Sequence, residues 1–301
     1  MLVARIVFSI ISSMLMFLVI TLQNEIWPEN VKIFSDILIY TFFFLLAFLT
    51  QKKYIVRKID NTLGKHICAY LLLILCITFF YNTVWGLMMK YQVNGLAPIH
   101  LTELFAQIPL NDFSWISQVM PQWVDNILHF AYATGYSSPL CIPVLIAFYN
   151  RNFEQGWRYF ISGHLLQCIL IFPLLILFQT QEIWYFKHIP DGLYREFANE
   201  LDMFRTSVNC FPSMHTSIAM ASLIVVLRDD NRIFKVIWGV YCGLTIISTV
   251  VFPIHWVLDM VAGGTLGIIS VWITNKLIKY NQENEIVKMF VGRLIKVKRT
   301  F

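Results

Sequence analysis

The sequence predicts an all-α membrane protein, a polytopic helical bundle. Three observations predict this class. Of the 301 residues, 57% are hydrophobic, and only 14% are charged, whereas an ordinary soluble domain has about a quarter charged residues. The apolar residues also form long segments of about 20, the length of a helix that crosses a bilayer. A soluble domain could not bury this much apolar surface, so we expect lipid to solvate much of the chain.

Eight apolar segments are candidate membrane-spanning helices. They lie at residues 4–22, 34–51, 66–88, 126–149, 158–179, 214–228, 233–251 and 256–275. In the first, the apolar run from Ile6 to Leu22 follows Arg5 and is not followed by a small-residue cleavage site, so we interpret it as a retained helix and not a signal peptide. These segments predict two additional helices and a basic loop over residues 1–65, a six-helix core over 66–275, and a basic tail over 276–301.

Most of the 23 lysines and arginines fall on one side of this eight-helix arrangement. They lie at Arg5, in the connections 52–65, 150–158 and 228–235, and in the tail. Because cytoplasmic loops carry the excess of Lys and Arg, we expect both termini in the cytoplasm. The connections 89–125, 180–213 and 252–255 would then face a periplasm or a lumen.

Several classes of function are disfavoured by what the sequence contains. Five of the six cysteines lie in apolar segments, and only Cys210 lies in a polar connection. Neither a zinc-type Cys/His spacing nor a Gly-rich nucleotide loop is found, so we predict no metal and no cofactor. The basic residues sit in loops, which gives no reason to expect nucleic acid as a partner. Residues 282–300 fit either a basic amphipathic helix on an anionic leaflet or a disordered polybasic tail.

The segment Cys210-Phe-Pro-Ser-Met-His-Thr-Ser217 predicts an anion site at a helix start. Proline suits a first helical turn, and Ser213 and Thr216 can cap it. Free N–H groups and the helix dipole attract anions there. His215 adds a group that holds or gives a proton near neutral pH.

The segment His255-Trp-Val-Leu-Asp259 predicts an oriented histidine. The i, i+4 spacing would place both side chains on one helix face. Asp259 could then accept from one ring nitrogen and leave the other as a nucleophile. Since one helix in and one helix back separate His215 from His255, both should reach the same membrane depth.

Together these motifs resemble the type 2 phosphatidic acid phosphatase superfamily, over about residues 66–275. Pro212-Ser213-Met214-His215 is similar to its second motif, and Ser248-Thr249 followed by His255 and Asp259 is similar to its third. Thr249 stands where that family has Arg, and the first motif, Lys with six residues before Arg-Pro, is not found. Ser-Thr at this position resembles the branch containing the inositol phosphorylceramide synthases.

The resemblance implies roles for individual residues. His255 would attack phosphorus, Asp259 would orient it, His215 would protonate the leaving oxygen, and Ser213 would bind phosphoryl oxygens. The positive charge that phosphoryl transfer needs would come from Arg205 first, or from Lys187 or Arg195, each of which could instead be a solvated loop cation. His129 could line the same pocket, although packing is the plainer interpretation.

The predicted function is that of an enzyme acting on a lipid-linked phosphate. Its partners would be lipid substrates and the membrane. Transfer of a phospho-headgroup to a lipid hydroxyl is slightly favoured over hydrolysis of a lipid phosphate or polyprenyl (pyro)phosphate. A transporter would place its charges near the middle of the helices, and an inactive scaffold would have no need of His215, His255 and Asp259 together.

Overall fold

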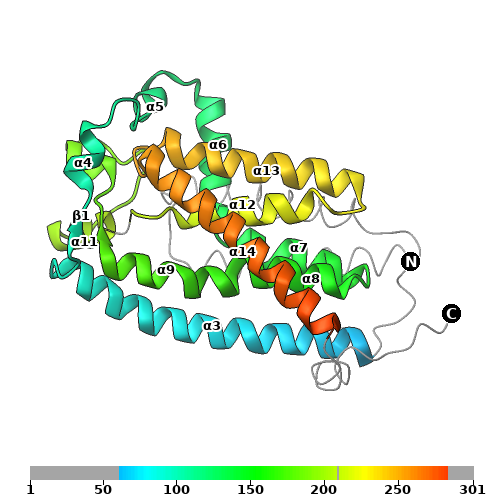
Figure 1. Ribbon diagram of the computed structural model, residues 1–301. Helices are drawn as coiled ribbons and strands as arrows, with labels where there is room; N and C mark the ends of the chain where they lie inside the picture. The colour runs from blue at the N-terminus through cyan, green and yellow to red at the C-terminus, as the bar shows by residue number, and fades with distance from the viewer. Residues whose placement is uncertain (1–60, 209, 284–301) are drawn as a thin grey trace.

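The computed structural model describes residues 61–208 and 210–283 (Figure 1). The predicted helices at 4–22 and 34–51, and nearly all of the basic segment at 282–300, lie outside these residues. The helices of the bundle are α3 (Asn61–Val93), α6 (Gln122–Gly135), α7 (Ser138–Tyr149), α8 (Phe153–Phe160), η1 (Ile161–Leu165), α9 (Leu166–Leu177), α12 (Met214–Val226), α13 (Arg232–Val251) and α14 (Val257–Glu283). Short elements complete the described chain: β1 (Ile99–His100), α4 (Thr102–Gln107), α5 (Trp115–Val119), β2 (Phe178–Gln179), α10 (Ile183–Lys187) and α11 (Glu200–Ser207).

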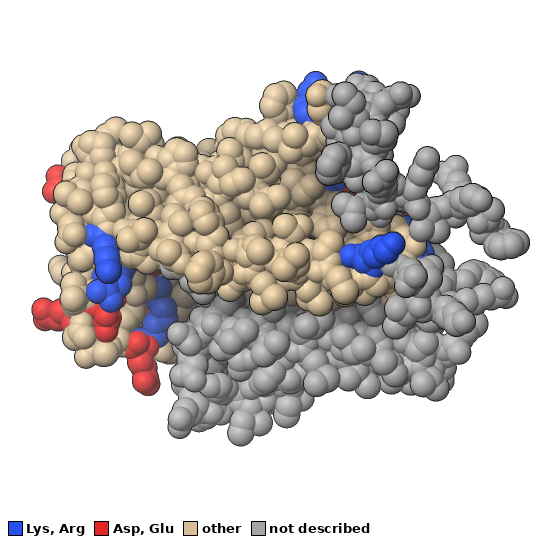
Figure 2. All heavy atoms as spheres, turned by 90° about the horizontal axis from the view of Figure 1, so that it is seen from below, with Lys and Arg blue, Asp and Glu red and all other residues tan. Residues whose placement is uncertain are grey.

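The protein is an integral membrane helical protein. Among the described residues, 4 helices are long and apolar enough to cross a membrane, or 5 if the bent pair α6 and α7 is one crossing. Helix α12 is apolar but has only 13 residues. On the face shown in Figure 2, the charged side chains of the described residues gather toward the two ends, and the surface between them is uncharged. The predicted total of eight helices remains a prediction.

The predicted single helix at 126–149 is instead two helices that meet at 72°. The break falls at Tyr136-Ser137, between Gly135 and Pro139. Proline lacks the N–H that would continue the α6 ladder, and a Gly/Ser-rich step bends easily. Gly135 also lies so close to α13 that an added Cβ would come within 2.4 Å of the Thr245 side chain.

Helices α12 and α14 pack closely at two glycines of α14. A Cβ on Gly263 would lie 2.3 Å from the Ser213 carbonyl oxygen, and one on Gly267 would lie 2.5 Å from that of Ser217. A Cβ on Gly264 would instead make an ordinary 3.6 Å contact with Met220. Small residues of this kind let membrane helices approach one another.

A polar cluster ties the same helices to the π-helical turn η1. The Ser162 carbonyl accepts hydrogen bonds from Gln167 Nε2 at 3.0 Å and from the Ser270 hydroxyl. Ser217 Oγ donates to Gln167 Oε1 at 2.5 Å. The cluster therefore joins the first turn of α12, which contains Ser217, to η1. Turns of the π type often occur at functional sites.

The predicted outer connections gather at one end of the molecule. Elements β1, α4, α5 and α11 lie together in Figure 1, away from the turns that join α7 to α8 and α12 to α13. The two short strands pair in parallel, with Ile99 opposite Phe178, and hold the connections together. Trp115 and Trp123 are exposed there, as expected of headgroup-level anchors.

Candidate active site

His215 lies in the first turn of α12. Ser213 is the N-cap, and its hydroxyl accepts from the Thr216 N–H at 3.3 Å, while Pro212 precedes the cap and is not in the first helical turn. The His215 ring stacks on Tyr132 with 4.3 Å between centroids, and the Tyr136 ring is tilted against it with 5.8 Å between centroids. The two tyrosines therefore hold the imidazole in a defined orientation.

His255 lies in the turn just before α14, not on the helix itself. Its Nδ1 is 3.6 Å from Asp259 Oδ2. Asp259 reaches back from the first turn to accept from the Trp256 N–H at 2.9 Å, which is half of a capping box. This cap, rather than a shared helix face, brings the predicted pair together.

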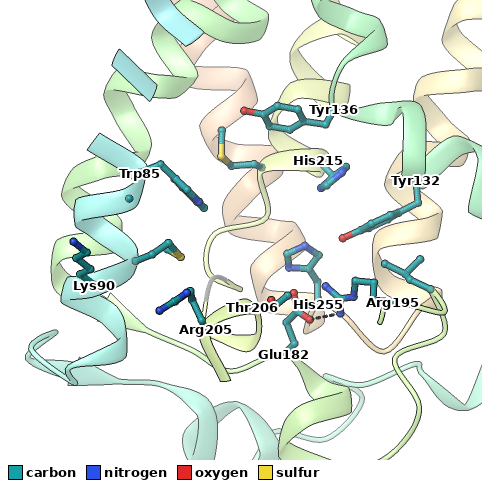
Figure 3. A pocket seen from close by; sticks show the side chains of 14 residues that line it. Trp85, Lys90, Tyr132, Tyr136, Glu182, Arg195, Arg205, Thr206, His215 and His255 are labelled. Atoms are coloured by element: carbon teal, nitrogen blue, oxygen red, sulfur yellow. Dashed lines mark hydrogen bonds and ion pairs between the residues drawn. The ribbon is translucent and has the colours of Figure 1, made fainter. Parts of the chain in front are cut away.

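Both histidines line one cavity of about 680 Å³. Figure 3 shows the two rings pointing into the same space, with Tyr132 beside them. The remaining wall comes from α3, α11, the outer connections, the break between α6 and α7, and the start of α12: Trp85, Gly86, Met89, Lys90, Tyr136, Glu182, Leu193, Arg195, Arg205, Thr206 and Met214. Since a phosphoryl group would fill a small part of this volume, the cavity has room for a headgroup as well.

The Lys, Arg, Asp and Glu residues that line the cavity are the three cations Lys90, Arg195 and Arg205 and the acid Glu182. Arg195 is largely buried and pairs with Glu182 at 2.6 Å and Asp191 at 2.7 Å. Although burial lowers its pKa, the Glu182 carboxylate outweighs that effect, so the pKa of Arg195 lies above its usual value. Arg205 is half-exposed and only 3.5 Å from Asp202. Figure 3 places Lys90 and Arg205 on the side of the cavity away from Arg195.

Three residues considered in the sequence lie elsewhere. Lys187 is not among the lining residues, and its ammonium group bonds to Asp112. Ser213 is fully buried and serves as the N-cap. His129 is buried and stacks on Tyr194, with 5.8 Å between ring centroids.

A comparison with protein families identifies the group to which these motifs belong. The model of the PAP2 superfamily matches residues 109–273, which is more than half of the chain and includes His215, His255 and Asp259. The chain belongs to the PAP2 superfamily. No curated relative and no solved structure matches the chain. Membership of this superfamily indicates lipid phosphatase or phosphotransferase activity.

Thr249 occupies the position where the PAP2 superfamily motif has Arg. It is fully buried, and its hydroxyl lies 2.9 Å from that of Thr216. This residue thus joins α13 to the turn that carries His215, and it supplies no charge.

The sequence did not single out Tyr132, Glu182 or Lys90 as site residues. The i, i+4 spacing of Tyr132 and Tyr136 was an available signal for a shared face. Glu182 and Lys90 carried no comparable signal, because only folding brings their segments to the histidines.

Among the described residues, one group has the residue types and the closeness of a metal site. It consists of Cys210, His255 and Asp259, whose ligand atoms lie within 4.8 Å of one another.

Proposed function

We propose that this PAP2 superfamily member transfers a phospho-group from a lipid through a phosphohistidine on His255. The observation that carries the proposal is that His215 and His255 line one cavity, with Asp259 behind His255. Because Nδ1 faces Asp259, the Nε2 atom is the one free to attack phosphorus. A base and an orienting acid in this relation are typical of nucleophilic catalysis.

The reaction runs in two halves. His255 Nε2 forms a bond to phosphorus while the bond from phosphorus to the leaving oxygen breaks, and His215 donates a proton to that oxygen. His215 then removes a proton from the acceptor, whose oxygen attacks phosphorus as the P–N bond breaks. Arg195 and Arg205 stabilise the negative charge on the phosphoryl oxygens in both halves.

The acceptor that we favour is a lipid hydroxyl, as in the inositol phosphorylceramide synthase branch. The size of the cavity supports this choice, because about 680 Å³ exceeds what a phosphoryl group and water require. Its wall from α3, with Trp85 and Met89, is apolar enough to meet a lipid. With the basic connections in the cytoplasm, the site would face a periplasm or a lumen. If water is the acceptor instead, the same phosphohistidine leads to hydrolysis of a lipid phosphate or polyprenyl (pyro)phosphate.

The test uses purified protein in lipid–detergent micelles with radiolabelled lipid phosphates or phosphoinositide, with and without ceramide or diacylglycerol. A labelled lipid that forms only with an acceptor supports transfer, and free phosphate without an acceptor means hydrolysis.

We predict that His255→Ala lowers turnover by about 10³-fold or more, because the nucleophile is lost. Asp259→Asn should lower it by about 10²–10⁴-fold through loss of orientation. The matched control is His100→Ala, which removes an exposed histidine of β1. Retained turnover in a folded His255→Ala protein would contradict the phosphohistidine route.

A further inference from the structure

Cys210 lies at the back of the candidate site, in the connection between α11 and α12. Its side chain is fully buried. The Sγ atom is 2.6 Å from Asp259 Oδ2, 3.5 Å from His255 Nδ1 and 3.2 Å from the Ile254 carbonyl oxygen. The thiol is therefore within reach of both members of the His–Asp pair and of a backbone acceptor.

The hydrogen bonds of Asp259 show which donor holds it. Oδ2 accepts from the Cys210 thiol at 2.6 Å and from the Trp256 N–H at 2.9 Å. His255 Nδ1 lies 3.6 Å away, beyond an ordinary N–H···O bond. Oδ1 has no hydrogen-bond partner within the described part of the chain. The thiol, and not the imidazole, is the closest side-chain donor to the carboxylate in this state.

The thiol is suited to act as a donor. Burial and the Asp259 carboxylate raise the pKa of Cys210 well above its usual value, so the S–H proton is retained at neutral pH. The Ile254 carbonyl is a second acceptor for the same proton at 3.2 Å. A rotation about the Cβ–Sγ bond would move the hydrogen bond from one acceptor to the other.

We propose that Cys210 is a positioning residue that holds Asp259 in the resting site and releases it during catalysis. When His255 carries a phosphoryl group, its ring is cationic and Nδ1–H attracts the carboxylate. The Cys210 thiol then donates its hydrogen bond to the Ile254 carbonyl instead of to Asp259. No covalent bond of Cys210 changes. This role rests on the proposed phosphohistidine function.

The first test compares Cys210→Ala, which removes the donor, with Cys210→Ser, which keeps one. We expect Cys210→Ala to lower kcat by about 10-fold with KM within about 2-fold, as for loss of one hydrogen bond. Cys210→Ser should stay within about 3-fold of wild type, because it keeps a hydrogen-bond donor for Asp259.

The matched control is Cys242→Ala, which removes another fully buried cysteine, in α13. It should leave kcat within about 2-fold of wild type. If Cys210 served packing alone, the smaller and more polar Ser would be no better than Ala. That result would overturn the proposal.

A second measurement does not depend on activity. The S–H stretching band in the infrared reports hydrogen bonding, and the Cys210 band is identified by its loss in Cys210→Ser. In Asp259→Ala this band should shift toward the frequency of a more weakly bonded thiol, and an unchanged band would overturn the proposed contact. Wild-type protein without His255-dependent turnover would instead overturn the proposed function, even where the infrared shift is found.

Discussion

At the scale of single residues, Arg195 and Arg205 reach the same cavity from very different surroundings. Arg195 is 16% exposed in its side chain and joins two carboxylates that are themselves 7% and 9% exposed. Its guanidinium also lies 5.3 Å from the Trp184 ring centroid. Arg205 is 49% exposed and has one long contact with Asp202. Arg195 therefore stabilises the fold as well as lining the site, whereas the side chain of Arg205 can move to contact a ligand.

This difference predicts different results for Arg195→Gln and Arg205→Gln. The first leaves Glu182 and Asp191 buried without their cation, which should destabilise the protein by about 3–5 kcal/mol. The second should lower kcat/KM by about 10–100-fold while the Tm changes little. Thermal unfolding in detergent and lipid-phosphate kinetics measure the two effects. Arg228→Gln, an exposed cation at the other end of α12, is the control. An unchanged kcat/KM in Arg205→Gln would remove Arg205 from the anion site.

At the scale of elements, the distance between α12 and α14 sets the geometry of the site. His215 lies in the first turn of α12, Asp259 lies in the first turn of α14, and His255 lies in the turn just before α14. The Ser213 N–H also donates to the Asp259 carbonyl at 3.2 Å, which joins the two starts directly. A side chain inserted at this crossing would separate the histidines without touching either.

Gly263→Ala should therefore be far more harmful than Gly264→Ala. The added methyl group would lie 2.3 Å from the Ser213 carbonyl in the first variant but 3.6 Å from the Met220 side chain in the second. Forcing a backbone apart in a packed interface costs about 1–3 kcal/mol. We expect Gly263→Ala to lower the Tm and to reduce turnover at least about 10-fold, with Gly264→Ala close to wild type. Equal behaviour of the two variants in the same assays would contradict this account of the helix crossing.

At the scale of the whole molecule, the positions of the two ends relative to the membrane decide where the substrate is met. Residues of α11 line the cavity. Elements α4, β1 and α11 lie at one end of the molecule, and the turns from α7 to α8 and from α12 to α13 lie at the other end (Figure 1). Since the Lys/Arg-rich connections are at the second end, that end is expected in the cytoplasm.

Cysteine labelling tests this orientation. Leu110 is 78% exposed near the cavity end, and Asp230 is exposed at the other. In a background with Cys68 and Cys76 replaced by Ser, a membrane-impermeant maleimide added to intact cells or sealed vesicles of known orientation should label Leu110→Cys from the periplasmic or lumenal side. Asp230→Cys should be labelled from that side only after permeabilisation. The reverse pattern would place the active site in the cytoplasm.

The sequence by itself determined the class of the protein and indicated the residues at the centre of the candidate site. Apolar segment length decides whether a helix can cross a bilayer, and the spacing around His215, His255 and Asp259 is local enough to be seen without a fold.

Only the tertiary structure decided what surrounds that centre. The bend between α6 and α7, the arrival of Lys90, Glu182 and Arg195 at the cavity, and the place of Cys210 against Asp259 depend on contacts between segments far apart in the chain. Charged loop residues look alike in sequence, because their role is set by which carboxylate or cavity they meet. Lys187 meets Asp112, and Arg195 meets Glu182 beside the two histidines. Periodicity and spacing report on one segment at a time, whereas charge pairing at this site is a property of several segments packed together.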